Sequence, residues 1–163
     1  MCVCLLPGVA SGHSSGSCRA EQLRLVASRY GEAGGSFIQT FVFTNAGGAP
    51  CRLAGWPSIA LRTESGRAGR VRAIRVVQGA PKAPPFRPVT LEPGGAASFD
   101  LFGADWNVRL NRACSKTSGL FVVPPGARRI PVSVAIPDCG GFFVAPIVAG
   151  RTDRDAWSVV WHG

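Results

Sequence analysis

Four widely spaced cysteines place the strongest constraint on how this 163-residue chain folds. The sequence holds six cysteines, and apart from the first two they lack the CxxC spacing that zinc sites usually show. We therefore interpret them as disulfide cysteines, which form in oxidising compartments. This interpretation predicts an exported protein, secreted or held in the cell envelope. The six residues are Cys2, Cys4, Cys18, Cys51, Cys114 and Cys139.

The first ten residues, MCVCLLPGVA, form a short apolar run followed by small residues. No Lys or Arg precedes the run, although the n-region of a signal peptide requires one. We interpret residues 1–17 as a signal-peptide remnant and linker behind a mis-assigned start, and residues 18–163 as the folded domain. Cys2 and Cys4 then belong to the removed segment.

The four remaining cysteines can pair in three ways. We favour Cys18 with Cys51 and Cys114 with Cys139, because each pair closes a loop of roughly 25 to 33 residues. In the chain-entropy account each bond stabilises the folded state by about 3 to 4 kcal/mol.

Alternating apolar and polar residues recur between turn signals from Cys18 onward, which is typical of β-strands. We predict an all-β fold, a single antiparallel immunoglobulin-like β-sandwich with about nine strands and two disulfides. The strand Ser36 to Thr44 is apolar on both faces and should lie centrally. Pro131 makes the strand Ile130 to Ile136 an edge strand, because proline donates no ladder hydrogen bond. The other expected strands are Leu23 to Ser28, Cys51 to Leu61, Val71 to Val77, Val89 to Leu91, Ala97 to Phe102, Leu120 to Val123, Phe142 to Val148 and Trp157 to Trp161.

Composition fits one compact domain without a transmembrane segment. Hydrophobic residues make up 46% of the chain and charged residues 17%, and no apolar run approaches the ~20 residues that span a bilayer. The formal net charge is +9, which can attract nucleic acid, anionic lipid or acidic polysaccharide. Because the excess is mostly Arg, alongside abundant Ala, Gly and Pro, GC-rich codons explain it better, and we expect no nucleic-acid partner.

Five arginines cluster around one predicted hairpin and form the candidate anion-binding site. Guanidinium groups at this density can contact phosphate or carboxylate polymers. The alternative, which we favour, is a charged edge strand that prevents sheet-to-sheet aggregation. The five are Arg62, Arg67, Arg70, Arg72 and Arg75.

Four tryptophans could form a sugar-stacking platform, but in a sandwich tryptophan more often packs in the core or at its rim, and we favour that role. They are Trp56, Trp106, Trp157 and Trp161.

Catalytic and metal-binding residues are sparse, so we predict no enzyme activity, no cofactor and no metal. The segment GHSSG matches the nucleophile elbow with Ser14 as nucleophile, but it lacks the preceding core strand and the following helix. The two histidines, His13 and His162, lie in the linker and beside the last residue. Asp153 and Asp155 supply too few oxygens for calcium, and a blue-copper site lacks its axial methionine.

The segments FTNAGGAPCRLAGWPSIAL and LEPGGAASFDLF, with Cys114 and Cys139 after them, resemble the secreted domain of unknown function 4232, found largely in actinobacteria. The resemblance covers roughly residues 18–148, and its motif residues are turn residues and cysteines. It implies an exported protein or lipoprotein and confers no activity. Lipidation at Cys18 is doubtful because Ser15 stands where a lipobox has an aliphatic residue. The matching positions are Cys18, Thr44, Asn45, Gly47, Cys51, Leu53, Gly55, Pro57, Pro93, Gly94, Ala97, Cys114 and Cys139.

Together these observations predict an exported, non-enzymatic envelope domain that binds a ligand or has a structural role. Its partner would be an anionic envelope polymer, a lipid headgroup or another envelope protein. The alternatives are a secreted hydrolase and a module that binds anionic polymers or carbohydrates.

Overall fold

The computed structural model describes residues 15–75 and 87–150. Within these ranges the protein is all-β, with one 3-10 turn, η1 (Ala20–Gln22), as its helical element. No helix in the described part of the chain is long and apolar enough to cross a bilayer. The predicted signal remnant up to Ser14, the predicted strand at Trp157 to Trp161 and the Asp153/Asp155 pair lie outside the described residues.

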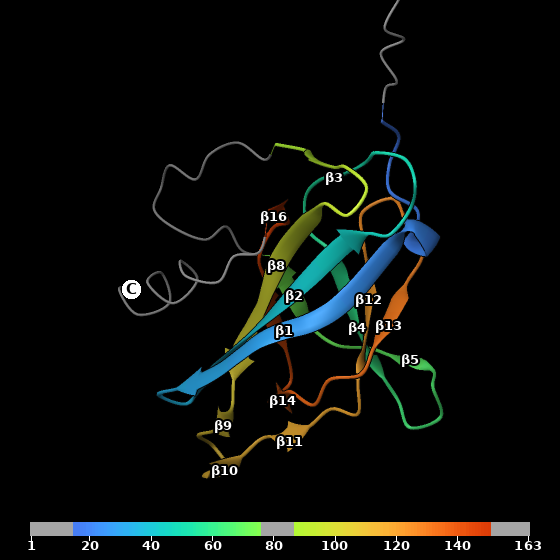
Figure 1. The fold of residues 1–163 in the computed structure, drawn as a ribbon. Helices are drawn as coiled ribbons and strands as arrows, with labels where there is room; N and C mark the ends of the chain where they lie inside the picture. The colour runs from blue at the N-terminus through green and yellow to red at the C-terminus, as the bar shows by residue number, and fades with distance from the viewer. Residues whose placement is uncertain (1–14, 76–86, 151–163) are drawn as a thin grey trace, which may run out of the picture.

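The strands form two larger sheets and three short two-stranded ones (Figure 1). The six-stranded sheet has the order β1 (Leu23–Ala33), β2 (Ser36–Asn45), β8 (Ala96–Ala104), β15 (Phe142–Val144), β6 (Ala73–Arg75), and β16 (Val148–Ala149) also pairs with β8. The four-stranded sheet has the order β13 (Ile130–Val132), β12 (Leu120–Val123), β4 (Ser58–Arg62), β5 (Ala68–Gly69). The short pairs are β3 (Cys51–Leu53) with β7 (Val89–Leu91), β9 (Trp106–Asn107) with β10 (Arg112–Ala113), and β11 (Ser115–Lys116) with β14 (Pro137–Asp138).

The predictions of an all-β fold and of two disulfides are confirmed for the described residues, whereas the single antiparallel sandwich of about nine strands does not match the observed sheets. β15 and β6 pair in parallel, and the described strands are shorter, more numerous and divided among several sheets. The expected strand Cys51 to Leu61 is two strands, β3 and β4, in different sheets. Gly55 lies between them with φ of +86°, a left-handed conformation that glycine adopts without strain, so the chain leaves one sheet and enters the other there.

The same interruption occurs in the expected strand Phe142 to Val148. The structure divides it into β15 and β16, with Pro146 between them. The amides on both sides of this proline bond to other segments: Ala145 N–H donates to the Asp100 carbonyl at 2.9 Å and Ile147 N–H to the Gly55 carbonyl at 2.8 Å. These two hydrogen bonds attach the segment between β15 and β16 to β8 and to the β3–β4 connection.

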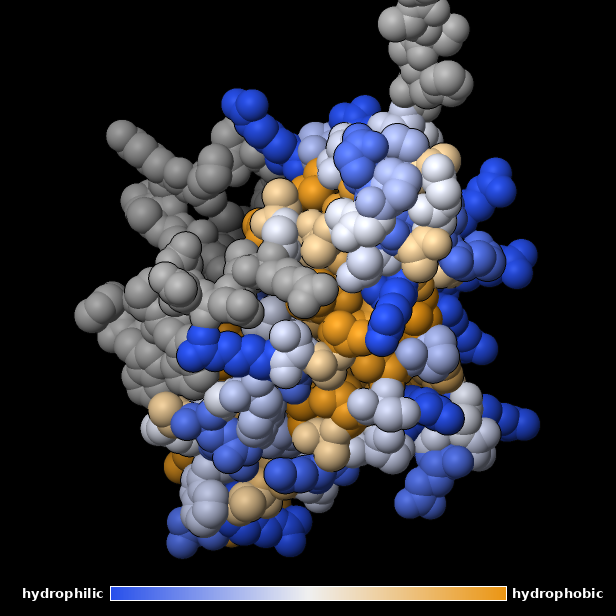
Figure 2. All heavy atoms as spheres, viewed as in Figure 1, coloured by the Kyte–Doolittle hydropathy of each residue, from blue (hydrophilic) through white to orange (hydrophobic). Residues whose placement is uncertain are grey.

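The apolar strand β2 lies between β1 and β8, as its sequence predicts, and most of its residues on both faces are buried. On its core face the ring of Phe41 stacks on that of Phe99 with centroids 5.1 Å apart, and Phe43 stacks on Phe99 at 5.6 Å. Leu120 and Val122 of β12 belong to the same core cluster. The core therefore joins the two larger sheets (Figure 1), and Figure 2 shows further apolar side chains gathered over the viewer-facing side of the molecule.

Pro131 lies in β13, the terminal strand of the four-stranded sheet, so its predicted edge position is confirmed. Its missing N–H costs no pairing, because among the described strands β13 pairs only with β12.

Two disulfides connect the cysteine pairs that loop length favoured. Cys18 and Cys51 bond in the core with their Cα atoms 4.7 Å apart, and both residues are almost fully buried. Cys114 and Cys139 bond with Cα atoms 5.3 Å apart, next to β11 and β14. The bonds thus lie in two separate loop regions of the domain.

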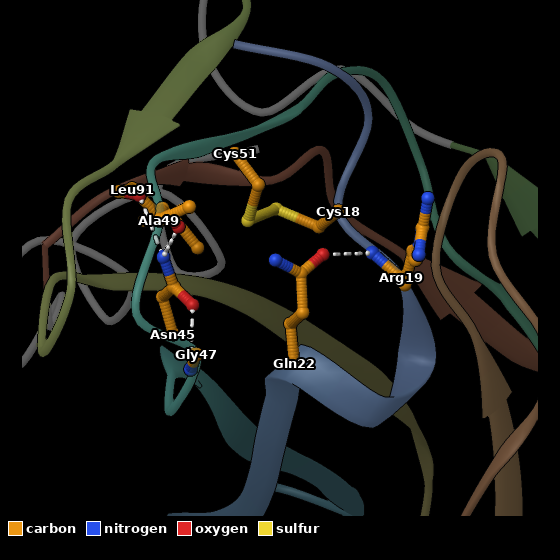
Figure 3. Close-up of a disulfide and its surroundings, with 8 residues drawn as sticks. All are labelled: Cys18, Arg19, Gln22, Asn45, Gly47, Ala49, Cys51 and Leu91. Atoms are coloured by element: carbon orange, nitrogen blue, oxygen red, sulfur yellow. Dashed lines mark hydrogen bonds between the residues drawn. A yellow bond between two sulfur atoms is a disulfide. The ribbon is translucent and has the colours of Figure 1, made fainter.

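The first disulfide lies beside a buried asparagine that bonds to both the β2–β3 loop and the β7–β8 turn (Figure 3). Asn45, 1% exposed, donates through Nδ2 to the carbonyls of Ala49 and Leu91, each at 2.9 Å, and its Oδ1 accepts the Gly47 N–H at 2.9 Å. Its backbone exchanges hydrogen bonds with the β7–β8 turn, from Gly94 N–H at 2.8 Å and to the Gly95 carbonyl at 3.0 Å. We call Asn45 and the Cys18–Cys51 bond, with the segments that they hold, the upper junction.

Candidate functional site

A hollow of about 710 Å³ opens at the end of the six-stranded sheet, beside the hairpin of β9 and β10. Its lining combines carboxylates, a lysine and an indole. The side chains that give it this character are Glu32, Asp105, Trp106, Val108 and Lys116.

The β1–β2 turn and the end of β8 bring these side chains together. Gly34 and Gly35 form the turn with positive φ values of 58° and 82°. The Asp105 N–H donates to the Gly35 carbonyl at 3.0 Å, and the Asp105 carbonyl accepts the Cys114 N–H at 2.9 Å. Asp105 therefore links the turn to the disulfide-bonded loop, and Glu32 lies on the strand that enters the turn.

Tyr30, near the hollow, has a raised side-chain pKa. Its hydroxyl donates a hydrogen bond to the Glu32 carboxylate, and its ring stacks on Phe37 with centroids 6.2 Å apart. Partial burial, followed by the hydrogen bond and charge of Glu32 and then the charge of Asp105, raises the pKa of Tyr30 well above its ordinary value. The Tyr30 hydroxyl is a hydrogen-bond donor at physiological pH.

The five candidate arginines do not all lie on one hairpin: two belong to strands of different sheets, and three lie in the connections between strands. Arg62 ends β4 and is half-buried. Arg67 lies in the following turn, where its backbone N–H donates to the Thr63 hydroxyl and its carbonyl accepts from the same hydroxyl. Arg70 and Arg72 lie between β5 and β6, and both are exposed. Arg75 belongs to β6 and is also exposed.

The two described tryptophans occupy different environments, and neither is in the buried core. Trp56 is half-buried, with the Arg75 guanidinium 6.0 Å from its ring centroid, a weak cation–π contact. Trp106 is 43% exposed and lines the hollow. Trp157 and Trp161 lie outside the described residues, so no joint platform can be described.

The residues considered for catalysis, His13, Ser14 and His162, also lie outside the described ranges. Across residues 15–75 and 87–150, no three or more His, Cys, Asp or Glu side chains are grouped so that they could hold a metal ion. The sequence did not predict the hollow, because Glu32 and Asp105 are far apart in the chain and line the same hollow only as a result of the pairing of β2 with β8. The alternating run WNVRLN at 106–111 is the signal that could have drawn attention to its rim.

A family model described as "Domain of unknown function (DUF4232)" matches residues 18–151. No curated protein matches the chain.

The Tyr30 environment predicts an elevated tyrosine titration. Tyr30 is the chain's one tyrosine, so the rise in tyrosinate absorbance during an alkaline pH titration reports on it alone. We expect the folded protein to titrate well above the midpoint of about 10 found for the chain unfolded in guanidinium. Glu32→Gln should lower the folded midpoint by removing the neighbouring charge, while burial keeps it above the unfolded value.

Glu92→Gln, at an exposed acid in the β7–β8 turn, is the matched control and should leave the midpoint unchanged. Coincident midpoints for the folded and unfolded wild-type chains would contradict the described environment.

Proposed function

The chain belongs to the family of the domain of unknown function 4232, and from this membership and its two disulfides we propose an exported, non-enzymatic domain of the cell envelope. In this proposal it binds an envelope component or contributes structurally to the envelope. The immunoglobulin-like arrangement predicted from the strand pattern belongs to the same proposal.

The disulfides are the observation that carries the proposal of export. Both cysteine pairs have Cα separations within the usual range for a disulfide, and structural disulfides persist chiefly in oxidising compartments. The Cys18–Cys51 bond is fully enclosed in the core, so a structural role fits it better than a redox-sensing one. A protein stabilised in this way is suited to an environment outside the cytoplasm.

The sequence supports the non-enzymatic part of the proposal. A Ser–His–acid hydrolase needs a histidine placed to activate its serine. The two histidines lie at positions 13 and 162, and the elbow-like GHSSG sequence lacks the strand and helix that such an elbow needs. A secreted hydrolase is therefore the weaker alternative.

The exposed arginines support an anionic ligand as the second part of the proposal. Arg67, Arg70, Arg72 and Arg75 are all exposed, and Glu64 is the one acid in the segment from Arg62 to Arg75. Such a segment attracts an anionic envelope polymer or lipid headgroup, and salt screens the attraction over about 8 Å at physiological ionic strength. Sugar stacking on tryptophan would not depend on salt in this way.

Thiol accessibility tests the proposal of export. We expect the native protein to be recovered outside the cytoplasm, with Cys18, Cys51, Cys114 and Cys139 resistant to alkylation under denaturing conditions. Reduction of the same sample should make all four reactive, which serves as the internal control. Recovery from the cytoplasm with free thiols at Cys18 and Cys51 would reject the proposal.

An array of glycans, lipids and nucleic acids, probed at low and moderate salt, tests the ligand class. We expect wild-type binding to anionic polymers or headgroups that weakens with salt and weakens further in Arg70→Ala/Arg72→Ala. Arg24→Ala/Arg128→Ala removes the same charge from other exposed positions and should bind nearly as wild type does. Equal binding by the two double variants would rule out the arginine segment, and salt-insensitive sugar binding would favour the tryptophans instead.

A further inference from the structure

The β9–β10 hairpin exposes three large apolar side chains close together in sequence. Trp106 is 43% exposed, Val108 83% and Leu110 58%, all within five consecutive residues. Apolar residues scattered singly over a protein surface are ordinary, whereas a contiguous exposed group commonly marks an interaction site. We call residues 106–113 the apolar hairpin.

The hairpin holds these side chains outward through its own hydrogen bonds. The Leu110 N–H donates to Oδ1 of Asn107 at 3.1 Å, and the Asn111 N–H donates to the Val108 carbonyl at 3.4 Å. Asn111 has φ of +48°, a left-handed conformation that asparagine tolerates. The turn is therefore formed before any partner arrives, and binding need not order it.

The base of the hairpin is fixed as well. β9 and β10 pair antiparallel, with Trp106 opposite Ala113. The next residue, Cys114, donates its N–H to the Asp105 carbonyl and bonds covalently to Cys139. Figure 1 shows β9 and β10 at the bottom of the molecule, at the opposite end from β3.

Charges on the hairpin alternate with its apolar residues. Arg109 lies between Val108 and Leu110, Arg112 follows in β10, and both arginines are exposed. Lys116 adds a third cation nearby. The acids of this end, Glu32 and Asp105, line the hollow that Trp106 and Val108 also line. The projecting turn thus combines apolar tips with cations.

We propose that the apolar hairpin docks on a lipid bilayer that contains anionic headgroups. Val108 and Leu110 enter the boundary between headgroups and acyl chains, and Arg109 and Arg112 contact lipid phosphates. Trp106 lies at the interface, where its ring is apolar and its N–H can meet water or a headgroup. A protein groove would satisfy the apolar tips but gives no reason for an arginine between them, whereas an anionic bilayer accommodates both.

The apolar hairpin is a different surface from the arginine segment of the proposed function. In this proposal it gives the domain a second contact with the envelope, at a lipid bilayer. Its test with purified protein does not depend on where the protein resides in the cell. Failure of one proposal is therefore distinguishable from failure of the other.

Vesicle co-flotation of the full-length oxidised chain tests the proposal, with phosphatidylglycerol–phosphatidylcholine vesicles compared with pure phosphatidylcholine. We expect binding to the anionic vesicles and little binding to the neutral ones. Arg109→Ala/Arg112→Ala should weaken binding by about five-fold per arginine, about 25-fold together. Val108→Asp/Leu110→Asp should weaken it by at least ten-fold.

Two variants are matched controls. Val26→Asp places an acid at another exposed apolar position, on β1, and should bind as wild type does. Arg24→Ala/Arg128→Ala removes the same charge as the hairpin variant from exposed positions outside both proposed surfaces, and it should weaken binding much less. Circular dichroism of every variant checks that it is folded.

Vesicles that carry brominated acyl chains give an independent readout of insertion. We expect the brominated chains to quench part of the wild-type tryptophan fluorescence. In Trp106→Phe this quenching should be absent. Failure of wild type to float with anionic vesicles would overturn the proposal. So would quenching that Trp106→Phe leaves unchanged, or a greater loss of binding in Arg24→Ala/Arg128→Ala than in Arg109→Ala/Arg112→Ala.

Discussion

The upper junction, where Asn45 and the Cys18–Cys51 bond meet, is the interaction on which the arrangement of the strands depends. A buried primary amide must find partners for its donors and acceptor, since each unpaired group costs about 1 to 3 kcal/mol. Asn45 finds them in two segments: Gly47 and Ala49 in the loop between β2 and β3, and Leu91 at the end of β7. The adjacent disulfide attaches the N-terminal segment to β3, and Cys18 N–H and Arg52 carbonyl add a backbone hydrogen bond of 3.1 Å.

This junction gives a physical reason for the residue pattern by which the family is recognised. Asn45 accepts hydrogen bonds from Gly47 in its own loop and from Gly94 in the β7–β8 turn, and Cys51 is bonded to Cys18 in the N-terminal segment. The pattern therefore records how the turns are held. The apolar hairpin lies at the opposite end of the molecule from β3 (Figure 1), and its residues Trp106, Val108 and Ala113 line the hollow. Changes to these side chains can therefore leave the junction undisturbed.

Local patterns predicted the elements well where a strand stays in one sheet. The bounds of β7 and β12 agree with the expected strands, β2 lies centrally because it is apolar on both faces, and Pro131 lies in an edge strand. The break between β3 and β4 was missed because alternation of side chains does not report which sheet a residue joins. The hollow depends on a register, Ser36 opposite Ala104, that brings Asp105 toward the β1–β2 turn, and nothing local in the sequence encodes that pairing.

A double-mutant cycle at the upper junction tests this account most directly. Unfolding free energies would be measured by chemical denaturation for wild type, Asn45→Ala, Cys18→Ser/Cys51→Ser and the combined variant. The control is Asn107→Ala, at a half-buried asparagine whose Oδ1 accepts the Leu110 N–H in the β9–β10 turn. We expect a loss of about 2 to 3 kcal/mol for Asn45→Ala and about 3 to 4 kcal/mol for the disulfide variant. The combined loss should fall short of their sum by about 1 kcal/mol or more, because both hold the same loop. Additive losses, or a loss for Asn45→Ala no larger than that for Asn107→Ala, would contradict the central role of the junction.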